Sequence, residues 1–202
     1  MYCLARVEPW TTPTLEGSIV RLEPLAERHT ADLFAASRDP RVWRWLPILQ
    51  PTTREEWQRW VDAAVAVTKA GAEMAFATVS MATGAAVGST RYLALRPEHR
   101  SLEIGWTWLA PEAWGTGANT EAKLLQLEHA FGPFECRRVE FKTDAANERA
   151  NPALAALPAV FEGIHRQHML VREGENRDSA WYSILDAEWP DVRAALQQRL
   201  GR

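Results

Sequence analysis

The chain has 202 residues and a net charge of −3. Its length favours a single domain that is large enough to bury a core. Without a basic surplus it does not look like a nucleic-acid-binding protein, and no apolar run approaches the roughly 20 residues of a membrane helix. The first residues lack the charged start and apolar core of a signal peptide. We therefore expect a cytoplasmic protein without nucleic-acid or membrane partners, whose Cys3 and Cys136 are free thiols and which holds no metal.

The chain shows no internal repeat and no low-complexity linker. We expect an N-terminal lead-in at residues 1–12 and a single domain at residues 13–202. Residues 14–25 alternate well enough to form a first strand. Residues 27–39 are predicted to form a helix, which ends before Pro40 because the residue before a proline disfavours the helical conformation.

The second predicted helix has clear signals at both ends. Thr53 precedes Glu56 by three residues, which is the spacing of a capping box, and Gly71 is a typical stop. The helix is therefore expected within residues 51–71. Two strands joined by a hairpin turn follow at residues 75–80 and 86–95.

The middle of the chain is predicted to be a strand–helix–strand unit. Its parts are a strand at residues 101–110, a loop at 111–119, a helix at 120–131 and a strand at 137–144. Two strands joined by a crossover helix run parallel in their sheet. This unit therefore predicts one parallel strand pair.

The last part of the chain is predicted to close the sheet. A short helix at residues 153–157 precedes an antiparallel pair at 159–171 and 177–186, and a helix at 187–200 has Asp186 as its expected cap. The fold class is therefore α/β (α+β): a mixed, mostly antiparallel sheet with one parallel crossover near its middle.

The loop "AWGTGAN" places Gly115 and Gly117 directly before a helix, where backbone N–H groups and the helix dipole can hold an anion. It is not a P-loop, because no second glycine precedes Lys123 at the required spacing. Nor is it a dinucleotide fingerprint, because Thr120 occupies the place of the third glycine. A glycine-rich turn without any ligand is the alternative.

The succession of elements, together with "EIGWTWLAPEAWGTGANTEAKLLQLEHAF", resembles the GNAT superfamily of acyl-CoA N-acyltransferases, and most closely its ribosomal-protein alanine acetyltransferase-like branch. The resemblance runs from about Thr14 to Leu200. It implies helices on both faces of the sheet and a splay between the two parallel strands. It also implies acetyl-CoA (coenzyme A) as co-substrate and a small-molecule or peptide amine as acceptor, and it allows a homodimer.

The resemblance also implies which residues contact the coenzyme. Loop amides would hold its pyrophosphate, the end of the preceding strand would pair with its pantetheine arm, and an asparagine after the following strand would touch it. The residues concerned are Trp108, Leu109, Ala110, Trp114, Gly115, Thr116, Gly117, Ala118, Asn119, Thr120 and Asn147. For Asn147, the alternative is a structural cap or turn residue.

Glu103 is the expected catalytic residue, since many relatives place a glutamate there to accept the amine proton directly or through water. Strand alternation puts it on the face opposite Ile104, Trp106 and Trp108, so a solvated surface glutamate is the alternative. Other titratable groups are weaker candidates. His165 and His168 are expected to face opposite ways on a strand, and Tyr92 and Tyr182 are poor substitutes for a general acid.

Ten tryptophans stand in this one domain. Core packing is expected for Trp57 with Trp60 and for Trp106 with Trp108, since each pair shares one face of its element. The tryptophans Trp43, Trp45 and Trp114 stand in or beside loops that would border an acceptor cleft, and packing against the core is the alternative role for each.

The chain also departs from the family pattern. Ala150 stands where many relatives carry a serine proposed to protonate the leaving thiolate, and Pro152 and Pro158 flank the short helix, with Pro158 in the place of a glycine. The sequence therefore predicts an acetyl-CoA-dependent N-acetyltransferase acting on a protein N-terminus, a lysine or a small amine. The alternatives are a domain that binds acyl-CoA without efficient catalysis and a structural domain with no affinity for the coenzyme.

Overall fold

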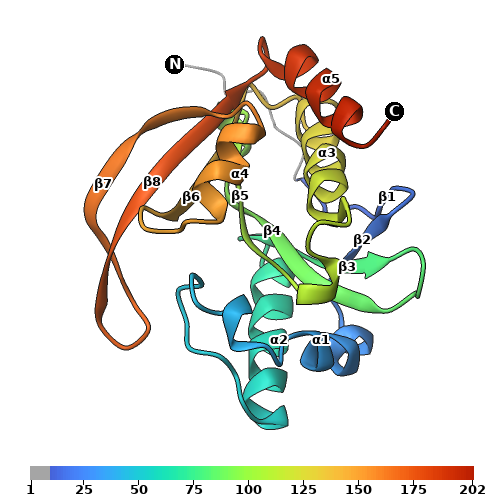
Figure 1. Ribbon diagram of the computed structural model, residues 1–202, viewed down its shortest axis with the longest axis vertical. Coiled ribbons are helices and arrows are strands. Elements are labelled where there is room, and N and C mark those ends of the chain that lie inside the picture. Colours follow the sequence, from blue (N-terminus) through green and yellow to red (C-terminus); the bar gives the residue numbers. More distant parts are fainter. Residues whose placement is uncertain (1–9) are drawn as a thin grey trace, which may run out of the picture.

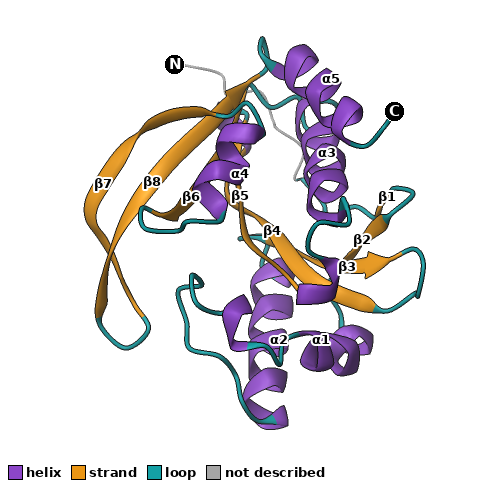
Figure 2. Ribbon diagram, in the orientation of Figure 1, coloured by secondary structure: helices purple, strands orange, loops and turns teal. Residues whose placement is uncertain are grey.

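The computed structural model describes residues 10–202. One sheet of eight strands, in the order β1-β2-β3-β4-β5-β6-β8-β7, runs through the molecule, with α1 and α2 on one side and α3 and α5 on the other (Figures 1 and 2). Only β5 and β6 pair in parallel within the described chain. The predicted fold class is confirmed. Cys3 and most of the predicted lead-in, residues 1–9, lie outside the described residues.

The N-terminal part differs slightly from its prediction. The single strand expected at residues 14–25 is two short strands, β1 (Leu15–Glu16) and β2 (Val20–Pro24), joined by a turn in which the Gly17 N–H donates to the Val20 carbonyl at 2.9 Å. A 3-10 turn at Glu27–His29 leads into α1 (Thr30–Ala36).

Helix α2 spans Arg54–Lys69, and its predicted capping box is confirmed. The Glu56 N–H donates to Thr53 Oγ1 at 3.1 Å, and the Thr53 N–H donates to Glu56 Oε2 at 3.1 Å. These two bonds satisfy N–H groups that have no partner within the helix.

The central strands follow as expected. The hairpin consists of β3 (Met74–Ser80) and β4 (Ala86–Arg96), and β5 (Ser101–Leu109) pairs antiparallel with β4. Helix α3 (Ala118–Phe131) then crosses to β6 (Arg138–Asp144). Parallel pairing between β5 and β6 is limited to residues 101–103 with 138–140. Beyond Glu103 the two strands separate, which is the predicted splay.

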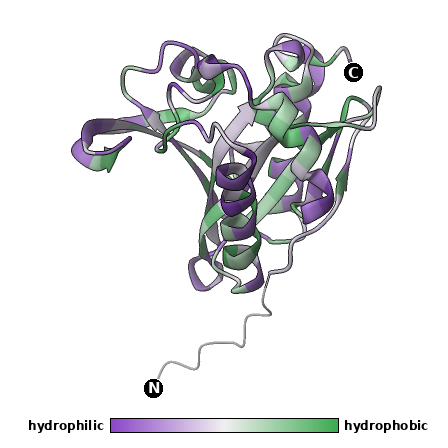
Figure 3. Ribbon diagram, turned by 90° about the horizontal axis from the view of Figure 1, so that it is seen from below, coloured by the Kyte–Doolittle hydropathy of each residue, from purple (hydrophilic) through white to green (hydrophobic). Residues whose placement is uncertain are grey.

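The C-terminal part completes the sheet. Helix α4 (Ala150–Ala156) begins three residues earlier than predicted, and β7 (Val160–Val171), β8 (Glu175–Leu185) and α5 (Trp189–Arg199) follow. Asp186 is not the cap of α5: that position belongs to Glu188, and the Asp186 carboxylate accepts the Ala187 N–H at 2.9 Å. The β7–β8 hairpin projects from the body and is largely hydrophilic at its tip (Figure 3).

A bulge in β5 reverses the predicted facing of its side chains. Gly105 pairs with Arg91 and Trp108 pairs with Ser89, so Trp106 and Thr107 together oppose one residue, and Trp106 has a φ of 51°. An extra residue in a strand inverts the alternation that follows it.

As a result, Ile104 packs in the core beside α3, while Trp106 and Trp108 pack in the core beside α2. The prediction that these three residues share one face, opposite Glu103, was therefore wrong.

The core beside α2 is built largely from tryptophans. Trp57 stacks on Trp60 at a centroid distance of 4.8 Å, and both contact Trp108 edge-on. Trp43 lies 5.7 Å from Trp57 and is only 3% exposed, so this loop residue belongs to the core and does not border the predicted cleft. This packing fixes β5 against α2 just where β5 leaves β6.

Candidate active site

A cavity of about 640 Å³ lies where β5 and β6 separate. Nine of the twelve residues predicted for the site line it: Glu103, Trp108, Leu109, Trp114, Gly115, Gly117, Asn119, Thr120 and Asn147. The other three, Ala110, Thr116 and Ala118, are neighbours of lining residues but do not line it themselves.

The loop before α3 has the form expected of an anion site. Gly115 and Gly117 have φ values of 76° and 89°, a region that favours glycine, and Gly117 is the N-cap of α3. Within the described chain, no group accepts a hydrogen bond from the N–H groups of Gly115, Thr116, Gly117, Asn119 or Thr120. Unpartnered N–H groups at a helix N-terminus attract a negative charge.

Trp114 forms a wall of the cavity that the sequence alone did not explain. Its indole Nε1–H donates to the Leu109 carbonyl at 2.8 Å, which ties the loop to the end of β5. The Arg149 guanidinium lies 3.6 Å from the ring centroid, and that of Arg41 lies 5.2 Å from it. Arg41, Arg149 and Arg199 all line the cavity, and they add positive charge that the sequence analysis had missed.

The Asn147 side chain is engaged in the protein's own structure. Its Oδ1 accepts the N–H groups of Arg149 and Ala150 at 3.1 and 3.0 Å, and its Nδ2 donates to Thr143 Oγ1 at 3.0 Å. The asparagine therefore forms a side-chain turn that shapes the approach to α4, whose N-cap is Arg149. Contact between Asn147 and a coenzyme stays a prediction.

Glu103 is buried, at 3% exposure, and borders the cavity. Its Oε2 accepts a hydrogen bond from Lys142 Nζ at 3.1 Å. Burial raises the pKa of the Glu103 carboxyl above its usual range, although Lys142 acts in the opposite direction. The alternative of a glutamate on a wet strand face is therefore wrong.

Lys123 is a further buried amine at the cavity wall, and the sequence analysis gave it no role. It is 7% exposed, and its Nζ donates to Thr107 Oγ1 at 2.8 Å and to Gln126 Oε1 at 3.2 Å. No carboxylate of the described chain lies within salt-bridge distance of it. Burial lowers the pKa of the Lys123 amine from 10.5 to about 7.

The other titratable candidates do not line the cavity. The Tyr92 hydroxyl donates to the Gln126 carbonyl within the core, and the Tyr182 hydroxyl lies 3.1 Å from Asn151 Oδ1. His165 and His168 were expected to face opposite ways, but their rings lie 5.6 Å apart against Trp181. A register shift in β7 between His165 and Met169 turns both toward one side.

Residues 10–202 offer neither a cluster of metal ligands nor a membrane-spanning helix. No group of three or more His, Cys, Asp or Glu residues within residues 10–202 is arranged to hold a metal ion. Among the helices of the described chain, none combines the length and the apolar character required to span a membrane.

The cavity, the glycine turn and the splayed strands agree with the match to known families. A family model described as "Acetyltransferase (GNAT) domain" matches residues 20–157. The chain belongs to the GNAT acetyltransferase family. The family predicted from the sequence is thereby confirmed, and membership indicates an acyltransferase.

Solved structures of other GNAT proteins extend this comparison. A GCN5-related N-acetyltransferase from Brucella melitensis is 35% identical, with a TM-score of 0.88 over 95% of this chain and 86% of its own. RimJ from Mycobacterium smegmatis, solved with CoA-disulfide, is 23% identical, with a TM-score of 0.78 over 96% of each chain.

RimL, a ribosomal L7/L12 alpha-N-protein acetyltransferase solved in its apo form, is 18% identical, with a TM-score of 0.75 over 90% of this chain and 99% of its own. RimJ and RimL therefore share the fold of this GNAT protein. No match was found among curated proteins.

Proposed function

We propose that this GNAT protein transfers an acetyl group from acetyl-CoA to a primary amine. The observation that carries the proposal is that unpartnered N–H groups before α3 and the buried carboxylate of Glu103 border one cavity, opened by the separation of β5 from β6. An anion-binding turn and a proton acceptor on either side of one space are what the reaction requires.

The residues around the glycine turn suit coenzyme A. The N–H groups of Gly115, Gly117 and Asn119 would hold its pyrophosphate, and the guanidinium of Arg149 adds charge beside them. Farther in, β5 has no strand partner on its β6 side beyond Glu103. The strand end from Trp108 to Ala110 would therefore pair with the pantetheine arm as a neighbouring strand does.

Acetyl-CoA supplies an activated acetyl group, so the protein's task is to orient the acceptor amine and take up its proton. Glu103 is the proposed base. Its raised pKa brings it closer to that of an amine, and Lys142 fixes its carboxylate through the 3.1 Å hydrogen bond. An α-amine, with a pKa near 8, needs less help in losing its proton than a lysine amine, with a pKa near 10.4.

Release of free thiol from acetyl-CoA across a panel of primary amines tests the proposal. Amine-dependent release, together with the mass of the N-acetylated product, is the expected result. Coenzyme A binding without release for any amine would favour the alternative of a binding domain. One observation motivates that alternative: Ala150 lines the cavity and offers no hydroxyl to protonate the leaving thiolate.

A further inference from the structure

The cavity holds a buried guanidinium that forms no ion pair with any described carboxylate. Arg177, near the start of β8, is 6% exposed and lines the cavity. Its side chain makes no hydrogen bond within the described chain, its Nε is buried without a partner, and no carboxylate there lies within 4.0 Å. Buried charges in proteins are normally paired, because an isolated one is strongly destabilising.

The surrounding carboxylates are engaged elsewhere. Asp144 and Glu103 are the nearby negative charges that act on Arg177, and Arg172 is a nearby positive one. Glu103 is bonded to Lys142, and Asp144 Oδ1 accepts the Ala146 N–H at 2.9 Å. Among the described residues that line the cavity, Glu103 is the sole carboxylate beside six cationic side chains: Arg41, Lys123, Lys142, Arg149, Arg177 and Arg199.

Arg177 lies on the same face of the sheet as the proposed base. Along β8, Ser179 pairs with Asp144 and Trp181 pairs with Lys142, and side chains two positions apart share a face. Arg177 continues this row, and Lys142 connects the row to Glu103. The guanidinium therefore belongs to the side of the cavity where the acceptor amine would meet its base.

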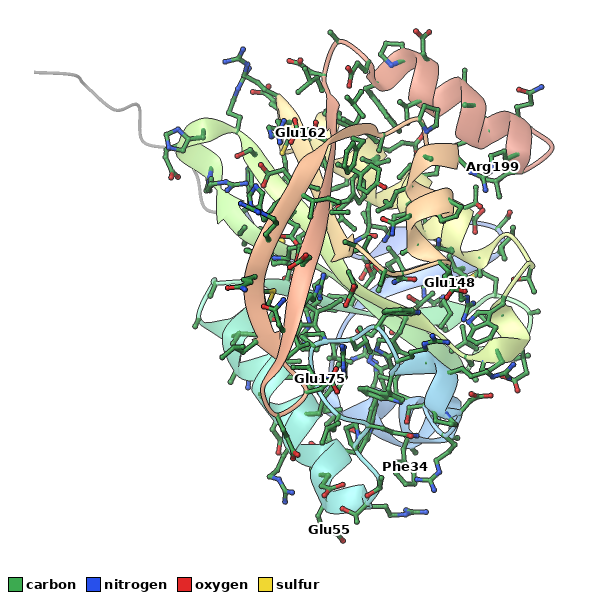
Figure 4. The ribbon with its side chains drawn as sticks, turned by 60° about the vertical axis from the view of Figure 1, so that its left-hand side comes forward. Phe34, Glu55, Glu148, Glu162, Glu175 and Arg199 are labelled. Carbon is green, nitrogen blue, oxygen red and sulfur yellow. The ribbon has the colours of Figure 1, made fainter. Side chains whose placement is uncertain are left out.

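The hairpin is bonded to the loop before α2 beside this region. In the turn between β7 and β8, the Arg172 N–H donates to the Pro47 carbonyl at 3.0 Å, and its guanidinium donates to the Leu46 carbonyl at 2.9 Å. Glu175 marks this end of the hairpin, and Glu162 lies toward the other (Figure 4). Leu46, Pro47 and Met169, the partner of Arg177 in β7, line the cavity with apolar surface.

We propose that Arg177 binds a carboxylate on the acceptor, so that the acceptor is a small amine carrying a carboxylate group. This inference rests on the proposed function. A guanidinium matches a carboxylate with two parallel hydrogen bonds, and the surrounding apolar walls strengthen such a pair. The bridge between Arg172 and residues 46–47 favours a small molecule over a polypeptide.

The test compares pairs of amines that either carry this negative charge or lack it. Glycine, β-alanine, γ-aminobutyrate and δ-aminovalerate are each assayed against their carboxamides, with thiol release as the readout. For at least one spacing, wild-type protein should prefer the acid by about 10- to 100-fold in kcat/KM, the range expected for hydrogen bonds to a charged group. Acetylation of amines with no preference for any acid would overturn the inference and leave the proposed function standing.

Variants then assign the preference to Arg177. Arg177→Met should reduce the ratio of acid to carboxamide to within a few-fold, mainly through KM, and Arg177→Lys should keep part of it. Arg91→Met is the matched control, because Arg91 is also buried, is paired with Glu73 at 2.8 Å and does not line the cavity. The control should lower stability and leave the ratio unchanged.

Two measurements on the same proteins complete the test. If Arg177→Met weakens coenzyme A binding in calorimetry while the ratio persists, the guanidinium belongs to the coenzyme site and the inference is wrong. If no amine is acetylated, the proposed function fails, and thermal shifts decide the inference. The inference is supported if the acids raise the melting temperature more than the carboxamides do and if this difference disappears in Arg177→Met. Equal rises in melting temperature overturn it. Acidic peptides that outperform every small acid would also overturn it.

Discussion

Lys123 offers a direct test of the electrostatics of the cavity. Its amine is buried beside two hydroxyls and an amide oxygen, and its pKa falls from 10.5 to about 7 on folding. Because the unfolded chain holds this proton more tightly, folding carries a penalty that is fully present below about pH 7 and vanishes above the unfolded pKa. A shift of this size corresponds to about 5 kcal/mol.

We therefore predict that Lys123→Met is more stable than wild type at about pH 6, with an advantage that shrinks by about 3 kcal/mol as the pH rises to about 9.5. Methionine has a similar length, and the partners left behind can still bond to each other, since Thr90 Oγ1 lies 2.8 Å from Thr107 Oγ1. Loss of the lysine's own hydrogen bonds lowers the stability of the variant by the same amount at every pH, so it leaves the pH dependence of the difference unchanged.

Urea unfolding of both proteins across this pH range measures the difference. Lys69→Met, at the exposed end of α2, is the control and should differ from wild type by no more than about 0.5 kcal/mol at every pH. A difference between Lys123→Met and wild type that stays flat with pH would refute the reasoning. It would mean that Lys123 keeps its proton in the folded state at no cost.

Four further predictions concern the coenzyme, the proposed base, the glycine turn and the buried carboxylate of Glu121. Coenzyme A at about 100 times its dissociation constant should stabilise the protein by about 2.7 kcal/mol, measurable as a rise in melting temperature. Glu103→Gln should lower kcat about 10²- to 10⁴-fold with little change in coenzyme affinity by calorimetry, and wild-type activity should fall as the pH drops through the raised pKa of Glu103. Gly117 has a φ of 89°, and a new Cβ there would lie 3.0 Å from Ile19, so Gly117→Val should weaken the binding of coenzyme A far more than that of pantetheine. Gly84, in an open hairpin with a φ of 71°, is the control, and Gly84→Val should lower stability alone. Glu121→Gln should lower the free energy of unfolding by about 3 kcal/mol, measured with a chemical denaturant, because the buried Glu121 carboxylate accepts three backbone N–H bonds of 2.6 to 3.0 Å. A variant as stable as wild type would show that the turn after β1 does not depend on these bonds.

The order of elements was predictable because its signals are local. The capping box at Thr53 and the glycine turn before α3 depend on residues a few positions apart, and both were found in the sequence. The bulge at Trp106 was not predictable, since tryptophan has no preference for a positive φ. That one residue decided the facing of the strand beyond it, so Trp106 and Trp108 were placed on the wrong face. The catalytic role of Glu103 stays a prediction.

The charged lining of the cavity was hidden for a different reason. Lys123, Arg149 and Arg177 come from α3, the start of α4 and β8, and each stands in sequence among residues that give no sign of a shared site. Only the folded sheet brings them around one cavity. The sequence therefore predicted where an anion would bind but not how many cations surround it.

The support beneath Gly117 links distant parts of the chain. Ile19 and Leu200 lie on the inner side of this glycine, and Arg202 contacts both Glu121 and Ser18. During synthesis, α3 and its glycine turn leave the ribosome about 80 residues before Leu200 does, because they precede it by that distance in the sequence. A nascent chain therefore carries the glycine turn before Leu200, one of the two residues that lie closest beneath Gly117, has been made.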